Sequence, residues 1–189
     1  MSATGKSSDT AFLRDVKTLR EAAQKSLDQG AVTDGYKNPE RSIELLQSAL
    51  ATEIVCVLRY TANSISVAGL NSKSVGEEFA EHAKDEREHM QMIAERIDQL
   101  GGEPDFDPKN LASRSATEYG HATTLIEMVQ QNLVAERIAI EHYRDLIKYF
   151  HDNDPTTRHM LEKILADEED HATDMHDLLE AHQGQPFLK

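Results

Sequence analysis

Two segments of the sequence repeat one pattern of acidic and histidine side chains. AKDEREH ends at His89, and ADEEDH ends at His171. In both segments a glutamate, Glu86 or Glu168, precedes the histidine by three residues. Residues three apart share one face of a helix, so each segment presents a carboxylate and an imidazole side by side. Such oxygen and nitrogen donors bind divalent metal ions, for example iron or manganese.

A second repeated pattern places a single glutamate in an apolar stretch. In LATEIVCVLRY, Glu53 is followed seven residues later by Tyr60. In LVAERIAIEHY, Glu136 is followed seven residues later by Tyr143. A carboxylate among apolar residues is costly to bury unless it is paired or bound to a metal ion. Two glutamates in this setting therefore indicate a shared site.

The spacing of the two patterns divides the chain into similar halves. The lone glutamate precedes the glutamate of its Glu-x-x-His by 33 residues in the first half and by 32 in the second. Together the halves supply enough ligands for two iron or manganese ions. A structural zinc site needs only four ligands, often thiolates. The residues selected in this way are Glu53, Glu86, His89, Glu136, Glu168 and His171.

Neighbouring residues allow simpler interpretations. Glu118-x-x-His121 also fits the motif but has no matching partner, so we interpret it as a chance occurrence. Cys56 follows Glu53 by three residues, and we interpret it as a small buried residue rather than a ligand. Asp85 and Asp167 either accept the second ring N–H of the ligand histidine on the opposite helix or are surface acids.

The elements that position these residues are predicted to be helices, and no segment alternates for the length of a strand. Pro39 and Pro155 suit first helical positions, Asp154 suits an N-cap, and Gly101 suits a stop. Residues 103–115 have loop composition and form the longest connection, which lets the chain cross the bundle. We predict an all-α fold with helices over residues 10–29, 39–68, 74–100, 117–151 and 155–181.

Composition limits the classes of partner. The chain has 189 residues, 39% hydrophobic and 29% charged, and fits one domain. Its net charge of -14 disfavours nucleic acid and anionic membranes and favours cations. A single cysteine excludes an internal disulfide and a four-cysteine metal module. No apolar run is long enough to span a bilayer, and residues 1–10 lack the apolar core of a signal peptide, so we expect a cytoplasmic protein.

The arrangement resembles the ferritin-like superfamily, and within it the bacterioferritin branch. The resemblance rests on ATE at Glu53, DEREH, VAE at Glu136 and ILADEEDH, and covers about residues 41–183. It implies a ferritin-like four-helix bundle over residues 39–183, with a helical N-terminal extension at 1–38 and a short tail at 184–189. The implied activity is a ferroxidase that oxidises Fe²⁺ with O₂ or H₂O₂ for iron storage or detoxification.

The resemblance also implies a role for each site residue. Glu53 and His89 would be terminal ligands of one iron, and Glu136 and His171 those of the other. Two further glutamates would bridge the ions, and a tyrosine would lie beside them. The full set implied is Glu53, Tyr60, Glu86, His89, Glu136, Glu168 and His171, with two Fe ions per subunit and Mn as the alternative metal.

Three departures from bacterioferritins shape the remaining expectations. Arg87 stands where those proteins carry a haem-binding methionine, so no haem is expected. Only 18 residues follow His171, too few for the fifth helix of 24-subunit cages. The N-terminal helix is an addition. With these three features the chain resembles bacterioferritin-like relatives of the DNA-protecting mini-ferritins. That resemblance favours a homo-oligomeric cage of twelve subunits over one of 24.

Other functions remain open on the same bundle. One is another di-metal oxidoreductase such as a peroxidase, a manganese catalase or an oxygenase, although the four-cysteine domain of rubrerythrin-type peroxidases is absent from this sequence. Another is a protein that coats DNA. Residues 1–30 hold five Lys or Arg and four Asp or Glu, so no basic arm is evident and DNA binding is not expected. A bundle that has lost its metal is disfavoured because all six ligand positions are filled.

Overall fold

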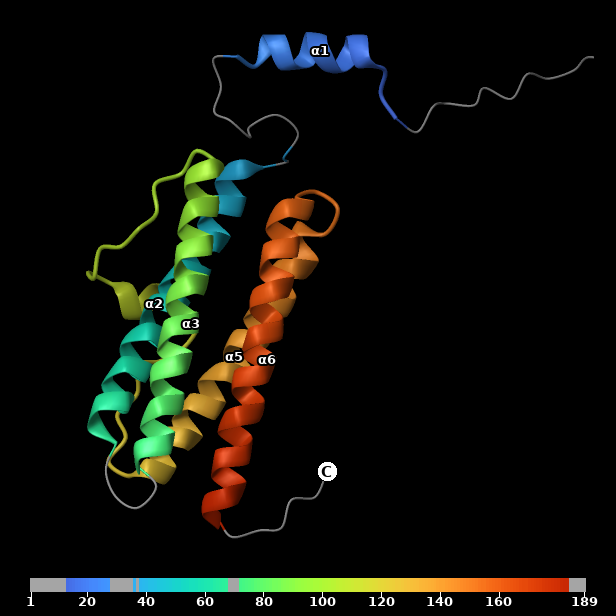
Figure 1. Ribbon diagram of the computed structural model, residues 1–189. Helices are drawn as coiled ribbons and strands as arrows, with labels where there is room; N and C mark the ends of the chain where they lie inside the picture. The colour runs from blue at the N-terminus through green and yellow to red at the C-terminus, as the bar shows by residue number, and fades with distance from the viewer. Residues whose placement is uncertain (1–12, 28–35, 37, 68–71, 184–189) are drawn as a thin grey trace, which may run out of the picture.

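The computed structural model describes residues 13–27, 36, 38–67 and 72–183, and all regular elements in these ranges are helices (Figure 1). The all-α prediction is therefore confirmed. No described helix is both long and apolar enough to cross a membrane. The helices are α1 (Val16–Lys25), α2 (Pro39–Ser66), α3 (Ser72–Gln99), α4 (Leu111–Arg114), α5 (Leu125–Phe150) and α6 (Pro155–Gln183).

Four long helices form the bundle that was predicted. α2 packs mainly on α3 and α5 mainly on α6, while contacts of α2 with α5 and of α3 with α6 join the two pairs. The connection from α3 to α5 returns along the length of the bundle, so α5 starts at the end where α3 starts (Figure 1). The short helix α4 within this connection packs on α2. This crossover lets all four long helices contribute side chains to one central layer.

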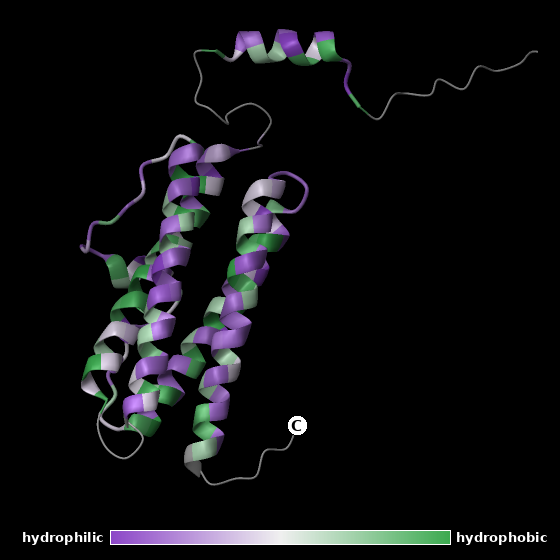
Figure 2. Cartoon of the chain, in the orientation of Figure 1, coloured by the Kyte–Doolittle hydropathy of each residue, from purple (hydrophilic) through white to green (hydrophobic). Residues whose placement is uncertain are grey.

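The apolar core lies in two clusters. Hydrophobic residues recur along the bundle helices between hydrophilic ones (Figure 2), as expected for helices with one buried face. One cluster contains Leu50, Ile93 and Phe150, and the other contains Phe79 and Met175. Buried glutamates and histidines from the same four helices complete the interior.

Several helix ends follow the predicted signals. α6 begins at Pro155, and the backbone N–H of Thr157 donates to Oδ1 of Asp154 at 2.9 Å. Asp154 also accepts from Arg96 at 2.9 and 3.0 Å, so the cap ties α6 to α3. After α3, Gly101 adopts a φ of 84°, which a side chain would disfavour. The predicted stop at this glycine is confirmed.

Other boundaries were predicted wrongly. α5 begins at Leu125 rather than at residue 117, so the crossover runs over residues 100–124 and is longer than predicted. Thr124 caps this helix through a capping box with Glu127. The stretch predicted as loop contains α4. α1 covers only Val16–Lys25 and buries no residue. The tail at 184–189 and residues 10–12, 28 and 29 lie outside the described ranges.

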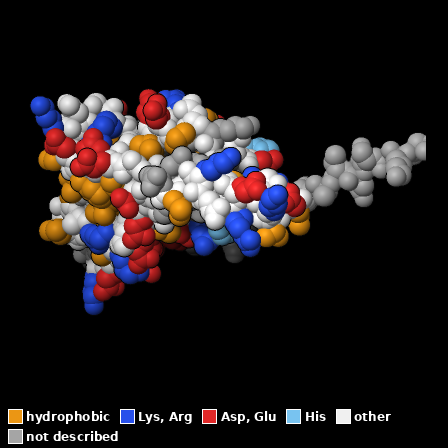
Figure 3. Space-filling model, turned by 90° about the horizontal axis from the view of Figure 1, so that it is seen from above, with side chains coloured by type: hydrophobic (Ala, Val, Ile, Leu, Met, Phe, Trp, Pro, Cys, Tyr) orange, Lys and Arg blue, Asp and Glu red, His pale blue; other side chains and the backbone are white. Residues whose placement is uncertain are grey.

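One cleft on the surface is lined mainly by acidic side chains. On the face seen from above, charged side chains of both signs are interspersed with small groups of hydrophobic ones (Figure 3). By contrast, a cleft of about 540 Å³ beside α3 and α6 is lined by eight Asp or Glu and three His. No described Lys or Arg lines it. This cleft, called here the α3–α6 cleft, leads to the residues discussed next.

Candidate metal centre

The six predicted ligands meet in the middle of the bundle. One comes from α2, one from α5, and two each from α3 and α6, and all six are at most 4% exposed. Their donor atoms form two groups, within each of which all atoms lie within 4.8 Å of one another. Glu86 and Glu168, the residues predicted to bridge, belong to both groups. The groups are Glu53, Glu86, His89 and Glu168, and Glu86, Glu136, Glu168 and His171.

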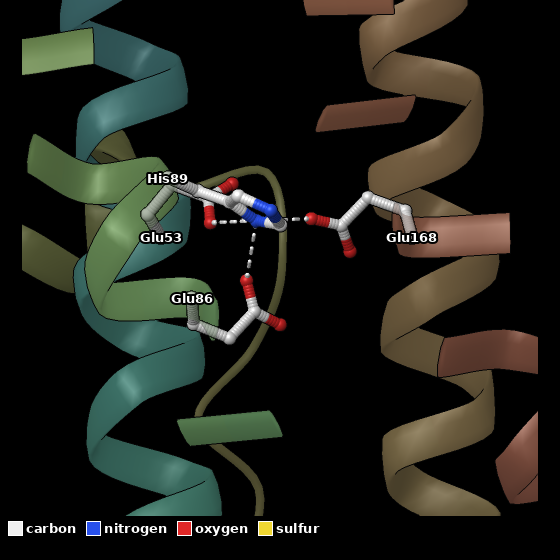
Figure 4. A group of neighbouring side chains, drawn as sticks. All are labelled: Glu53, Glu86, His89 and Glu168. Atoms are coloured by element: carbon white, nitrogen blue, oxygen red, sulfur yellow. Dashed lines mark ion pairs between the residues drawn. The ribbon is translucent and has the colours of Figure 1, made fainter. Parts of the chain in front are cut away.

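The first group surrounds one ring nitrogen of His89 (Figure 4). Nδ1 of His89 lies 3.2 Å from Oε1 of Glu168, 3.4 Å from Oε2 of Glu86 and 3.5 Å from Oε2 of Glu53. These carboxylates approach from α6, α3 and α2, respectively (Figure 4). In the second group, Nδ1 of His171 lies 3.7 Å from Oε1 of Glu86. Nδ1 is therefore the ring nitrogen that both histidines turn toward the carboxylates.

Most donor atoms at this centre lack hydrogen-bond partners. Eight buried nitrogen and oxygen atoms of the six residues form no hydrogen bond within the described part of the chain. No Lys or Arg of the described ranges forms an ion pair with the four glutamates. Buried polar groups are normally satisfied, so converging orphaned donors fit bound cations. The eight atoms are Oε2 of Glu53 and Glu136, both Oε atoms of Glu86 and Glu168, and Nδ1 of His89 and His171.

Burial and mutual repulsion shift the pKa values of the metal-free centre. Burial, together with the charge of Glu86, raises the pKa of Glu53 to about 8 and also raises the pKa values of Glu136 and Glu168. Burial opposes ionisation of Glu86 too, but contacts with His171 and other neighbours lower its pKa. The metal-free centre therefore holds protons on some of its carboxyl groups, and metal ions would displace them.

The outer nitrogen of each histidine faces an aspartate on the opposite helix. Nε2 of His89 lies 3.1 Å from Oδ2 of Asp167, and Nε2 of His171 lies 3.7 Å from Oδ2 of Asp85. The contact of His89 is the cross-helix hydrogen bond that the sequence suggested for Asp167, whereas the distance from His171 to Asp85 is too long for a hydrogen bond. An N–H held by a carboxylate fixes the tautomer that leaves Nδ1 free to bind a metal ion.

Two tyrosines form hydrogen bonds with Glu136 and Glu53. Tyr60 donates a hydrogen bond to Oε1 of Glu136, and Tyr143 donates one to Oε1 of Glu53. Both phenols are fully buried. The sequence placed only Tyr60 beside the site, and no function beyond packing was assigned to Tyr143. The signal that could have found it is the repeated Glu-to-Tyr spacing, which applies equally to both halves.

The remaining candidates lie outside the two groups. Cys56 is buried, its Sγ lies 3.8 Å from Oγ1 of Thr117, and burial raises the pKa of its thiol. It belongs to neither donor group. Glu118 and His121 are exposed and lie in the connection before α5 rather than on a helix. They therefore do not share a helical face, and the expectation that they start a helix was wrong.

Comparisons with known proteins agree with this geometry. Residues 43–183 match the ferritin-like domain family. A DNA protection during starvation protein of Pyrococcus furiosus is 27% identical over 143 residues, which cover 74% of this chain and 77% of that protein. The structure of the dodecameric thioferritin of Bacteroides fragilis, a bacterioferritin-related protein, is 32% identical, covers 89% of this chain and 99% of its own, and gives a TM-score of 0.76.

A third match concerns the metal centre most directly. The structure of a ferritin-like diiron-carboxylate protein of Bacillus anthracis is 26% identical and gives a TM-score of 0.67, with coverage of 75% of this chain and 96% of its own. The family match covers the four bundle helices almost completely and includes all six predicted ligands. The chain therefore belongs to the ferritin-like domain family.

Proposed function

We propose that the protein is a ferroxidase that binds two Fe²⁺ ions per subunit between the four helices and oxidises them to Fe³⁺ with O₂ or H₂O₂. Iron storage and detoxification are the functions that this activity would serve. The observation that carries the proposal is the pair of donor groups that share Glu86 and Glu168, with eight buried donor atoms left unpartnered. The diiron-carboxylate protein among the structural matches supports iron as the metal.

The charges of the centre suit two divalent ions. Four ionised glutamates carry as much negative charge as two Fe²⁺ ions carry positive charge, so binding neutralises a group that is costly to bury alone. Bound iron would supply the electrons that reduce the oxidant. The four glutamates would hold the ions between them, and the imidazoles of His89 and His171 would each add one nitrogen ligand.

The first experiment removes one shared carboxylate at a time. Glu86→Ala and Glu168→Ala should each abolish fast Fe²⁺ oxidation in stopped-flow absorbance measurements while the helical circular dichroism is kept. Glu88→Ala and Glu169→Ala are matched controls, because both side chains are exposed neighbours on the same helices. Unchanged oxidation in either of the first two variants would contradict the assignment.

We further propose that the subunits form a closed cage of twelve, since the similar thioferritin of Bacteroides fragilis is described as dodecameric. Native mass and iron content after aerobic Fe²⁺ loading of the full chain would test this. A twelve-subunit mass with far more than two irons per chain supports storage in a cage. A dimer that stops at about two metals per chain would instead favour another di-metal oxidoreductase, to be assayed with peroxide and manganese.

Direct DNA binding needs its own test, because one relative is named for DNA protection. We propose that this chain does not bind DNA, since its net charge of -14 opposes the phosphate backbone. A gel-shift assay at low salt, where electrostatic attraction is strongest, should show free DNA only. A salt-sensitive shift would overturn this part of the proposal.

A further inference from the structure

A further group of potential ligands lies beside the six-residue centre. Glu78 and His82 are four residues apart on α3, and Asp174 follows His171 by three residues on α6. Nε2 of His82 lies 3.4 Å from Oε1 of Glu78 and 3.4 Å from Oδ2 of Asp174. One donor atom of each residue lies within 4.8 Å of the other two. Three donors from two helices therefore converge on one point.

One ring nitrogen of His82 contacts two carboxylates, and the other is left without a partner in the described ranges. The side chain is 2% exposed, and its Nδ1 has no hydrogen-bond partner in the described ranges. Both carboxylate contacts of the ring involve the same nitrogen, Nε2. A neutral imidazole has only one N–H and cannot donate to both carboxylates. The two contacts of 3.4 Å are also long for hydrogen bonds.

The two carboxylates beside His82 have no Lys or Arg partner in the described part of the chain. No Lys or Arg of the described residues forms an ion pair with Glu78 or Asp174. Partial burial, with repulsion by Asp174, raises the pKa of Glu78. With the ring proton on Nδ1, the lone pair of Nε2 points between two carboxylate oxygens, and three electron-pair donors then face one another without a positive charge. A divalent cation would satisfy all three.

We propose that Glu78, His82 and Asp174 bind a third divalent transition-metal ion. This third site would hold Fe²⁺ temporarily before the ion moves to the two-ion centre. One imidazole and two carboxylates suit such a metal and leave other coordination positions to water. The carboxylate side chains are 36% and 48% exposed, whereas the imidazole is buried. A hydrated ion can thus enter and leave from the solvent side.

The position of this group connects it to the centre. All three residues line the α3–α6 cleft, which also reaches His89 and His171. The ring of His82 stacks on that of His171, with centroids 4.0 Å apart and planes inclined by 22°. An ion bound to His82 would therefore contact a ring that stacks directly on His171, the proposed ligand of the second iron. Binding at the third site does not depend on the ferroxidase proposal, but its role as an iron donor rests on it.

Zinc tests binding without oxidation chemistry. Calorimetric titration of the metal-free full chain with Zn²⁺ should give three ions per subunit, and anomalous scattering from Zn²⁺-soaked crystals should place one at His82. The variant Glu78→Gln/Asp174→Asn should weaken the third ion more than about tenfold and leave the other two. The control Glu81→Gln/Asp170→Asn removes the same charge from the same cleft and should keep three ions.

The outcomes separate the site from its alternatives. Zinc at the two-ion centre but not at His82 would overturn the proposal. An equal loss in both double variants would also overturn it, because general attraction by the acidic cleft would then explain binding. Retention of the third ion in Glu78→Gln/Asp174→Asn would do the same.

Repeated additions of Fe²⁺ test the role of the third site as an iron donor. The first addition should be oxidised at the wild-type rate by Glu78→Gln/Asp174→Asn, whereas later additions should be oxidised several-fold more slowly because refilling is slower. Equal rates in all additions would overturn this role. If the wild-type protein binds three Zn²⁺ but oxidises no Fe²⁺, the ferroxidase proposal fails while the third site stands, so the two failures are distinguishable.

Discussion

The hydroxyl of Tyr60 on α2 donates a hydrogen bond to Glu136 on α5, and the reverse contact exists as well. Tyr143 on α5 donates to Glu53 on α2. In each glutamate Oε1 accepts the hydrogen bond from the phenol, while Oε2 has no hydrogen-bond partner within the described ranges. The two tyrosines therefore hold one oxygen of each glutamate and leave the other oxygen free to bind a metal ion. The same tyrosine–glutamate pairing thus occurs in both halves of the site.

Removing one phenol should affect mainly one metal ion. Tyr143→Phe should weaken the ion held by Glu53, and Tyr60→Phe the ion held by Glu136, each by about tenfold, the lower end of the effect of losing a residue that supports a ligand. Stepwise Zn²⁺ titration measures both affinities, and anomalous scattering identifies the weakened position. Tyr149→Phe is the control, since that ring is partly exposed. Equal weakening of both ions by either variant would contradict the pairing.

Asp167 and Asp85, which face the outer nitrogens of the two ligand histidines, should contribute unequally to metal affinity. Asp167 lies 3.1 Å from Nε2 of His89, whereas Asp85 lies 3.7 Å from Nε2 of His171. Asp167→Asn should therefore lower metal affinity by about tenfold or more, and Asp85→Asn should lower it less. Calorimetry with Zn²⁺ measures both. The exposed Asp177→Asn controls for the lost charge. A larger loss in Asp85→Asn would show that orientation of the imidazole is not the cause.

Much of the fold and of the centre could be predicted because the signals are local. Glu-x-x-His places two ligands on one helical face whatever the helix packs against. The start of α6 also follows from adjacent residues, since Asp154 and Pro155 are an N-cap and a first helical residue. The matching intervals in the two halves then indicated that the pairs would meet. The structure brings those six residues together in one layer.

The start of α5 was missed for a different reason. The capping box of Thr124 and Glu127 is present in the sequence, but the predicted helix was extended upstream of it to residue 117. Gly120 adopts a φ of 69°, which is incompatible with a continuous right-handed helix before the cap. The contacts of His82 with Asp174 and His171 depend on how α3 and α6 pack. Such contacts have no signature in the spacing within a single helix.

Metal binding should release protons and become tighter as the pH rises. Burial and the charge of Glu86 raise the pKa of Glu53 to about 8. Burial opposes protonation of His171, but its contact with Glu86 raises the pKa of that imidazole to about 9. A group with a raised pKa keeps its proton until the pH passes that value, so a metal ion must displace these protons at pH 6 to 7. Zn²⁺ calorimetry in two buffers of different ionisation enthalpy measures the number released.

The same pKa shifts determine whether the stability of the metal-free protein rises or falls with pH. A raised pKa stabilises the metal-free protein at low pH, and this contribution is lost as the pH rises through about 8 for Glu53 and about 9 for His171. The increase in Tm caused by Zn²⁺ should therefore be larger at pH 8 than at pH 6. A Tm increase that shrinks with rising pH would contradict the assignment of these protons.

The buried pair of Arg96 and Asp154 should control stability rather than metal binding. Asp154 accepts from Arg96 and also caps α6 through the N–H of Thr157, and the charged side chains are only 4% exposed. Asp154→Ala leaves a buried guanidinium without its partner, so the free energy of unfolding should fall by about 3–5 kcal/mol. Denaturant titration of the metal-free protein measures this loss.

Two comparisons make that prediction specific. Asp152→Ala removes an exposed acid that pairs with Arg158, so the free energy of unfolding should change by less than about 1 kcal/mol. Zn²⁺ affinity of Asp154→Ala should stay close to wild type, because Asp154 precedes Glu168 by fourteen residues, about 21 Å along the helix. A large loss of metal affinity with normal stability would mean that the end of α6 positions the centre, and the division between structural and metal-binding residues would be wrong.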